Sequence, residues 1–172
     1  MDNFETAISA VLRHEGDRFV DDPTTGECSR WGVELRWYRM YLDPAATKET
    51  IRNLTTEQAT SFYRDNYWTR NKFFLIKDPW VADKLFDLGV NVGPGTAVKL
   101  AQKVLNILGD HNLTEDGILG PRTASALENT KPLKFLLRFV QDMDSYYRLI
   151  ASRDPNKAKF LDGWLNRLYD SC

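Results

Sequence analysis

The sequence predicts a mainly α-helical fold with two lobes and a small β-hairpin or irregular insertion after the first helix. Three observations support this prediction. Apolar residues recur at the spacing of one helix face in seven or more segments. Residues 16–33 lack that spacing and contain many turn-forming and β-prone residues. Three glycines fall within residues 89–95, where we expect the two lobes to meet.

The first half begins with a predicted helix over residues 3–15, which ends at Gly16 because glycine readily takes the backbone conformation that ends helices. After the irregular segment, helical patterns resume near Glu34. A further helix is predicted over residues 55–69, since Thr55 and Gln58 have the spacing of a capping box.

The second half is predicted to consist of helices between short loops. Prolines mark several helix starts, because the first residue of a helix needs no N–H for pairing. The predicted helices run from Pro79 to about Leu88, from the end of the glycine-rich break to Gly109, from Pro121 through Leu127, from Pro132 through Ile150, and over 160–168. We expect two units, residues 1–90 and 91–172, packed as one compact whole.

Composition narrows the class of protein. The 172 residues are 42% hydrophobic and 27% charged, which is typical of a soluble globular protein. A net charge of −1 argues against a general nucleic-acid binder, and no segment is long and apolar enough for stable membrane insertion. The N-terminus lacks the pattern of a secretory signal. Cys28 and Cys172 are expected to be free thiols, and no spacing predicts a metal site or a cofactor.

Glu15 interrupts the pattern of the first helix, whose apolar face consists of Phe4, Ala7, Ile8, Val11 and Leu12. Continuing that face by one turn places Glu15 where a core residue would be expected. Apolar surroundings and the negative end of the helix dipole both raise a carboxyl pKa, and a general acid requires a protonated carboxyl group. The alternative is a Glu in a frayed last turn, facing solvent or paired with Arg13 or Arg18.

The segment after Glu15 carries further polar side chains, namely Asp17, Asp21, Asp22, Ser29, Arg30 and Trp31. Glycoside hydrolysis needs such a cluster, because one carboxyl group protonates the leaving oxygen and a second group meets the nucleophile or the cationic transition state. The alternative interpretation of Asp21, Asp22 and Pro23 is a plain acidic turn.

Several motifs in order resemble one family. HEGDRFVDDPTTGECSRWGV, residues 14–33, is similar to the start of the lysozyme-like N-acetylmuramidases of glycoside hydrolase family 108 from phages and bacteria. The segments 85–106, 115–127 and 160–168 resemble that family's predicted peptidoglycan-binding region. The resemblance spans Phe4 to Leu168, and it implies a lysozyme-like fold and bacterial peptidoglycan as the partner.

The resemblance implies roles for residues matched by position. Glu15 stands at the family's essential Glu and would be the general acid. Asp22 stands at the Asp of an Asp-Pro pair, and Ser29 stands at a Thr. We therefore treat Glu15, Asp22 and Ser29 as catalytic candidates, and the candidate substrate contacts are Asp21, Arg30, Trp31, Asn91 and Gln102.

The sequence also departs from the family pattern. Asp17 replaces a second glycine, the loop after Pro23 is shorter, and Ser29 replaces the threonine. The second carboxylate is therefore open between Asp17, Asp21 and Asp22.

Two of the candidate contacts have equally plausible structural interpretations. Asn91 follows a predicted helix end and could serve an acetamido sugar or only a turn. Gln102 lies beside the apolar face of its helix and could face a cleft or solvent. For the possible sugar platforms Trp31, Tyr63 and Trp68, core packing is at least as plausible.

The predicted function is hydrolysis of the β-1,4 bond between N-acetylmuramic acid and N-acetylglucosamine. We expect a monomeric endolysin that waits in the host cytoplasm and reaches the wall once the membrane is breached; a bacterial lysozyme exported by other means is equally compatible. The alternatives are a non-catalytic peptidoglycan-binding or secretion-accessory protein, and a glycosidase acting on chitin or chitosan.

Overall fold

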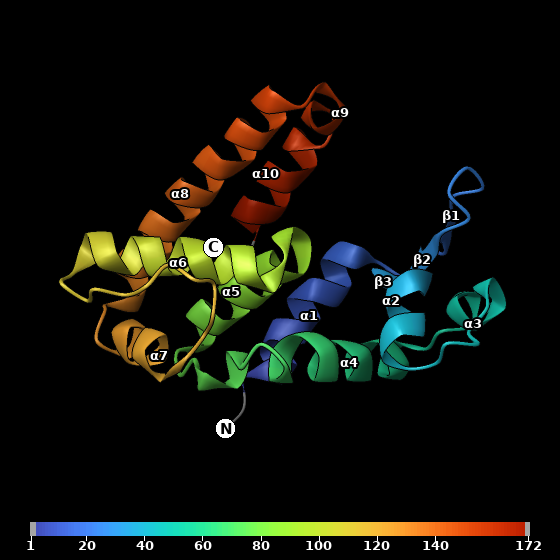
Figure 1. Ribbon diagram of the computed structural model, residues 1–172, viewed down its shortest axis with the longest axis horizontal. Helices are drawn as coiled ribbons and strands as arrows, with labels where there is room; N and C mark the ends of the chain where they lie inside the picture. Colours follow the sequence, from blue (N-terminus) through green and yellow to red (C-terminus); the bar gives the residue numbers. More distant parts are fainter. Residues whose placement is uncertain (1–2, 171–172) are drawn as a thin grey trace.

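The computed structural model describes residues 3–170, and helices make up most of them (Figure 1). The α-helices are α1 (Phe4–Glu15), α2 (Leu35–Tyr41), α3 (Lys48–Arg52), α4 (Thr56–Tyr63), α5 (Pro79–Val92), α6 (Pro94–Leu108), α7 (Pro121–Glu128), α8 (Pro132–Arg153), α9 (Pro155–Ala158) and α10 (Leu161–Asp170). A π-helix, η1 (Arg64–Thr69), and a 3₁₀-helix, η2 (Phe73–Leu75), lie between α4 and α5. Among residues 3–170, no helix combines the length and the apolar character needed to cross a membrane.

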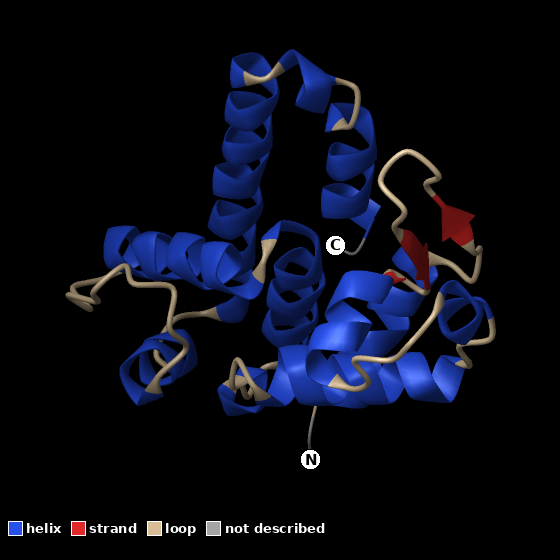
Figure 2. Ribbon diagram, turned by 45° about the vertical axis from the view of Figure 1, so that its right-hand side comes forward, coloured by secondary structure: helices blue, strands red, loops and turns tan. Residues whose placement is uncertain are grey.

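A small antiparallel sheet follows α1, and Figure 2 shows its strands in red. Its strands β1 (Val20–Asp21), β2 (Cys28–Arg30) and β3 (Val33–Glu34) lie in sequence order. Val20 lies opposite Ser29, and Ser29 lies opposite Glu34. The predicted mainly helical fold with a small β insertion is therefore confirmed. Cys28 is a free, buried thiol, whereas Cys172 lies outside the described residues.

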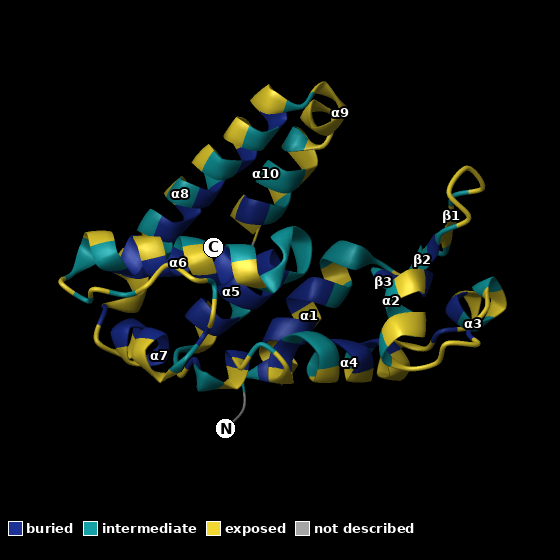
Figure 3. Cartoon of the chain, in the orientation of Figure 1, coloured by how far each residue is buried: buried dark blue, intermediate teal, exposed yellow. Residues whose placement is uncertain are grey.

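The helices pack in a chain of neighbours: α1 on α5, α5 on α6, α6 on α8, and α8 on α10. In Figure 1, α8 and α10 project together from the body of the molecule, with α9 at their tip. The buried residues lie where these helices meet. The facing sides of α1 and α5 are buried, whereas α9 and most of the β1–β2 connection are exposed (Figure 3).

Aromatic rings fill the core between α1, η1 and α5. Trp68 packs edge-on against Phe4 and Phe86, with ring centroids 5.5 and 5.1 Å apart. Phe73 completes the group beside Trp68 and Phe86. Trp68 is 1% exposed, so it is a core residue and does not offer a surface on which a sugar can stack.

The glycine-rich break expected over residues 89–95 is shorter than predicted. Helix α5 continues through Gly89 to Val92, and the chain turns at Gly93, where φ is 90°. A side chain at position 89 would crowd the Phe73 ring, because a Cβ there would lie 3.1 Å from Cζ of Phe73. Glycine at this position therefore lets the Phe73 ring lie against the helix. The expected division between residues 90 and 91 falls inside α5.

The helix predicted over residues 55–69 is present, but its second half changes form. Thr55 and Gln58 form the predicted capping box at the start of α4. From Arg64 the backbone becomes the π-helix η1, which no spacing in the sequence indicated. π-helical turns are uncommon and frequently occur at functional sites. Tyr67 of this turn packs against Tyr63, with ring centroids 5.4 Å apart.

Helix α5 carries a partly buried acidic side chain, Asp83, next to the buried charged residues Lys84 and Asp87. Oδ1 of Asp83 is buried and has no hydrogen-bond partner among the described residues. Burial, and then the negative charge of Asp87, raise the pKa of Asp83 from 3.8 to about 6. The folded protein therefore holds a proton on Asp83 more tightly than the unfolded chain does.

We expect Asp83 to make the protein less stable as the pH rises between about 4 and about 6, because the folded state binds more protons than the unfolded state in that interval. The Asp83→Asn variant should match the wild type near pH 4 and melt at a higher temperature at pH 7. Melting temperatures at both pH values check this, with the exposed Asp110→Asn as the control. An equal difference from the wild type at both pH values would contradict the assignment.

Candidate functional site

Glu15 is the last residue of α1, and Gly16 ends the helix as predicted, with a φ of 68°. The Glu15 side chain is 21% exposed, and its Oε1 accepts a hydrogen bond from Nη1 of Arg167 at 2.7 Å. Its other oxygen, Oε2, lies against Gly32, since a Cβ built on that glycine would be 2.6 Å away. The carboxyl group is thus held between α1, the turn before β3, and α10.

The turn over Trp31 and Gly32 is shaped to receive this carboxyl group. Both residues have positive φ, 54° and 71°, a conformation that is costly for Trp31 because it carries a side chain. The hydroxyl of Tyr63 donates a hydrogen bond to the carbonyl oxygen of Trp31 at 3.0 Å, which holds the turn in place. Burial, and then the negative charge of Glu15, raise the pKa of Tyr63 well above its usual value, so Tyr63 remains a neutral donor.

A buried set of charges lies behind Glu15. Arg167 Nη2 donates to Oδ1 of Asp87 at 2.9 Å, and Asp87 is fully buried. His14 Nδ1 lies 3.0 Å from the same Asp87 oxygen, and its Nε2 lies 3.1 Å from Asp170. Burial lowers the pKa of Arg167, but Asp87 and Glu15 outweigh burial, and the net shift is upward. Arg167 is therefore a permanent cation beside Glu15.

Asp22 lies in the turn after β1 and is hydrogen-bonded within that turn. Its carboxylate accepts from the hydroxyls of Thr24 and Thr25 at 2.5 and 2.8 Å. These hydrogen bonds lower the pKa of Asp22 from 3.8 to about 2, the Thr24 hydroxyl having the largest effect. Asp22 is therefore a carboxylate at any pH well above about 2. The neighbouring Asp21 forms an exposed ion pair with Lys48 at 2.6 Å.

The other predicted residues of this segment lie on the sheet. Ser29 is half-buried in the central strand, β2. Arg30 fastens the sheet to its surroundings, since its Nε donates to the carbonyl oxygen of Asp17 at 3.1 Å and its Nη1 donates to that of Arg52 at 2.5 Å. The β insertion thereby keeps a fixed position relative to α3.

Asn91 and Gln102 make contacts within the second half of the chain. Asn91 Nδ2 donates to the hydroxyl of Tyr147 at 2.7 Å and connects α5 to α8. Gln102 is buried, and its Nε2 donates to Oδ1 of Asp116 at 2.8 Å while its Oε1 accepts from the Gly117 N–H at 2.8 Å. Gln102 thus fastens the loop before α7 onto α6, and the structure does not bring it into contact with Glu15.

A groove lies between α2, η1 and the junction of α5 with α6. It has a volume of about 260 Å³, and its lining includes Trp37, Tyr41, Asn66, Tyr67, Arg70 and Asn71. The rings of Trp37 and Tyr41 are nearly parallel, with centroids 6.0 Å apart. The Tyr67 ring lies 5.4 Å from the Tyr63 ring, so two neighbouring tyrosines connect this groove to the Glu15 turn.

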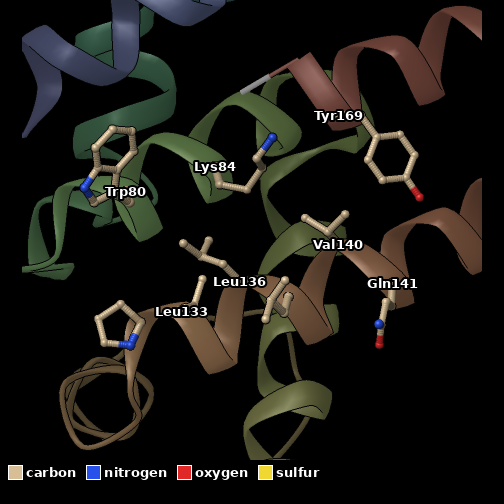
Figure 4. A pocket seen from close by; sticks show the side chains of 9 residues that line it. Trp80, Lys84, Leu133, Leu136, Val140, Gln141 and Tyr169 are labelled. Carbon is tan, nitrogen blue, oxygen red and sulfur yellow. The ribbon is translucent and has the colours of Figure 1, made fainter. Parts of the chain in front are cut away.

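A larger hollow of about 700 Å³ lies between α5, α8 and α10 (Figure 4). Its lining is mostly apolar, from Trp80, Leu133, Leu136 and Val140, with Lys84 and Tyr169 at the side of α5 and α10. Neither Glu15 nor Gly32 lines this hollow. This hollow is therefore separate from the Glu15 site, although it is larger than the groove beside Trp37 and Tyr41. Among residues 3–170, no group of three or more His, Cys, Asp or Glu side chains is placed to hold a metal ion.

Sequence reasoning missed Arg167, which contacts Glu15, and Asp87, which holds Arg167. Asp87 carried a usable signal, because it interrupts the apolar run Leu85-Phe86-Asp87-Leu88 in a helix expected to be buried. A carboxylate in such a position needs a cation or several hydrogen bonds. No spacing could name Arg167 as that cation, because it lies 80 residues farther along the chain.

Comparison with known proteins places the chain in a family. The family model for Glycosyl hydrolase 108 matches residues 8–93, and the Predicted Peptidoglycan domain matches residues 96–169. The structure of SagA from Brucella abortus is 24% identical, with a TM-score of 0.79 over 98% of this chain and 90% of that one, so the fold is shared. No curated protein matches the chain. Because the first match spans half of the 172 residues, the chain belongs to the glycosyl hydrolase 108 family.

Proposed function

We propose that this glycosyl hydrolase cuts the β-1,4 bond between N-acetylmuramic acid and N-acetylglucosamine in bacterial peptidoglycan, and that it serves as an endolysin. Family membership supports the hydrolase, and the match of residues 96–169 to the Predicted Peptidoglycan domain supports the substrate. The proposal rests on one observation: three elements enclose the Glu15 carboxyl group, and the Glu15 side chain is still 21% exposed.

In this proposal Glu15 is the general acid. Oε1 already accepts a hydrogen bond from Arg167, so the transferable proton belongs on Oε2. Glu15 gives that proton to the glycosidic oxygen as the bond from this oxygen to the anomeric carbon breaks and its electron pair moves to the oxygen. The anomeric carbon becomes cationic and requires a second group on its other side.

We assign that second role to Asp22, either directly or through a water molecule held by Ser29. The support is electrostatic, because the threonine hydrogen bonds keep Asp22 ionised, and a negative charge stabilises an oxocarbenium-like transition state. Asp21 is the less suitable neighbour, since Lys48 already neutralises it.

The groove beside the site suits a glycan chain. The partly exposed rings of Trp37 and Tyr41 offer apolar surface to sugar rings where Arg36 and Arg70, which lie over them, leave it uncovered. Arg70 supplies hydrogen-bond donors, and so does the second amide N–H of Asn66 and of Asn71, since one N–H of each already donates to a helix carbonyl oxygen. Acetamido oxygens and the lactyl carbonyl oxygen of muramic acid are acceptors for such groups. Tyr67 lines this groove and packs against Tyr63, whose hydroxyl lies at the Gly32 turn beside Glu15, so the groove is next to the candidate acid.

The first test is Glu15→Gln on purified peptidoglycan. We expect the variant to lose about 10²–10⁴-fold in clearing rate, because the amide cannot supply the proton, while its melting temperature and its pull-down by peptidoglycan remain. Mass spectrometry of the wild-type products should find muramic acid at the reducing end.

Other outcomes would identify other functions. Equal clearing by both proteins would remove Glu15 from the mechanism. Pull-down without clearing by either protein would indicate a binding protein, and cleavage of chitin oligosaccharides without clearing of peptidoglycan would indicate a chitin-directed glycosidase.

A second test compares Asp22→Asn with Asp21→Asn, two changes at adjacent positions. We expect Asp22→Asn to slow clearing by at least about tenfold, because it removes the charge that meets the cationic carbon. Asp21→Asn breaks only an exposed ion pair, so its rate should stay near that of the wild type. A wild-type rate for Asp22→Asn would assign the second role to another group.

A third test uses the space around Glu15. In Gly32→Ala the new methyl group would lie 2.6 Å from Oε2 of Glu15 and 2.5 Å from the Tyr63 hydroxyl, so these groups must move. We expect about a 10²-fold loss of rate, because small displacements of a catalytic group are costly. Gly26→Ala is the matched control, since its φ of 74° imposes the same backbone strain with no atom within 4 Å. Because the Gly26 N–H donates to the carbonyl oxygen of Asp22, equal losses in both variants would show that crowding of Glu15 is not the cause of the effect.

A further inference from the structure

Arg167 reaches Glu15 from a part of the chain that the comparisons connect with binding. It lies on α10, within the residues 96–169 that match the Predicted Peptidoglycan domain. Its Nη1 nevertheless donates to Oε1 of Glu15 at 2.7 Å, across 152 positions of sequence. The second half of the chain thus supplies a direct neighbour of the candidate general acid.

The guanidinium group is held firmly in its own place. Nε of Arg167 lies 3.2 Å from both carboxylate oxygens of Asp87, and Nη2 lies 2.9 Å from one of them. A planar guanidinium that binds a buried carboxylate through two nitrogens has little freedom to rotate. Asp87 in turn lies 3.0 Å from Nδ1 of His14, the residue directly before Glu15.

Helix α10 is also attached to α5 and α1 at its neighbouring positions. The buried Nζ of Lys84 donates to the carbonyl oxygen of Leu168 at 2.8 Å. Asp170 lies 3.1 Å from Nε2 of His14. Contacts at Arg167, Leu168 and Asp170 of α10 therefore fix the direction from which Arg167 approaches Glu15.

This arrangement makes the two oxygens of Glu15 unequal. Oε1 is occupied by a permanent cation, whereas Oε2 lies at the Gly32 turn. Rotation of this carboxyl group about its Cγ–Cδ bond would exchange the positions of its two oxygens, and it would break the charge-assisted hydrogen bond from Arg167 on the way. Without this hydrogen bond the side chain could rotate, and the carboxyl group would spend less time in the orientation needed for proton transfer.

We propose that Arg167 is a positioning residue for Glu15, so that α10 of the predicted peptidoglycan-binding region completes the active site. The inference depends on the proposed role of Glu15. It assigns to the second half of the chain a part in the chemical step in addition to any part in holding the cell wall.

The test uses Arg167→Gln and Arg167→Lys, assayed on soluble glycan strands so that kcat and KM are separated. We expect Arg167→Gln to lower kcat by about 10–10²-fold with KM within about threefold of the wild type, because the lost contact orients the acid and does not hold the sugar. Arg167→Lys should recover part of kcat by returning the charge without the planar fork. Arg138→Gln is the matched control, since Arg138 pairs with Asp142 on α8 in the same region, and its rate should equal that of the wild type.

Removing Arg167 leaves Asp87 buried with less compensation, which can prevent folding. The double variant Asp87→Asn/Arg167→Gln removes both charges together and should show the same loss of kcat if the single variant does not fold. Melting temperature and circular dichroism verify the fold of each protein.

Two results would overturn the inference. One is a wild-type kcat in a folded Arg167→Gln protein, or in the double variant, while Glu15→Gln is inactive. The other is a rise in KM with unchanged kcat, because Arg167 would then act in binding. Full activity of Glu15→Gln would instead remove Glu15 from the proposed mechanism, so the two failures are distinguishable.

Discussion

The buried carboxylate of Asp87 requires compensation, and the residues that supply it join three helices at one point. Arg167 comes from α10 and His14 from α1, while Asp87 itself lies on α5. Removing a charge from water costs several kcal/mol unless partners replace the lost hydration. Helices distant in sequence are therefore held in one arrangement, and Glu15 lies at its edge, sharing Arg167 with Asp87.

The opposite side of Glu15 is formed by backbone. The turn at Trp31 and Gly32 has an unusual conformation that the Tyr63 hydrogen bond and the small sheet maintain. Local strain of this kind persists only where the surrounding structure holds it, and it is common at functional sites. The β insertion therefore shapes one side of the candidate site through its backbone. The sequence had drawn attention to this insertion for the acidic residues that it carries.

The second half of the chain has more than one role in this architecture. Asn91 and Gln102, which the resemblance suggested as substrate contacts, hold α8 and the loop before α7 in place. Arg167, which no motif singled out, contacts the candidate acid. Similarity to a family thus drew attention to these segments, whereas the structure shows which contacts each of these polar side chains makes.

The sequence by itself determined the local features: the helix that ends at Gly16 with Glu15 in its last turn, the capping box at Thr55, the proline-started helices and the irregular segment that became a sheet. Each of these depends on interactions among residues a few positions apart, which spacing reveals. Only the tertiary structure decided the continuation of α5 to Val92, the core position of Trp68 and the partners of Glu15. Those features depend on packing and on charge pairing between distant segments, and a linear pattern does not contain that information.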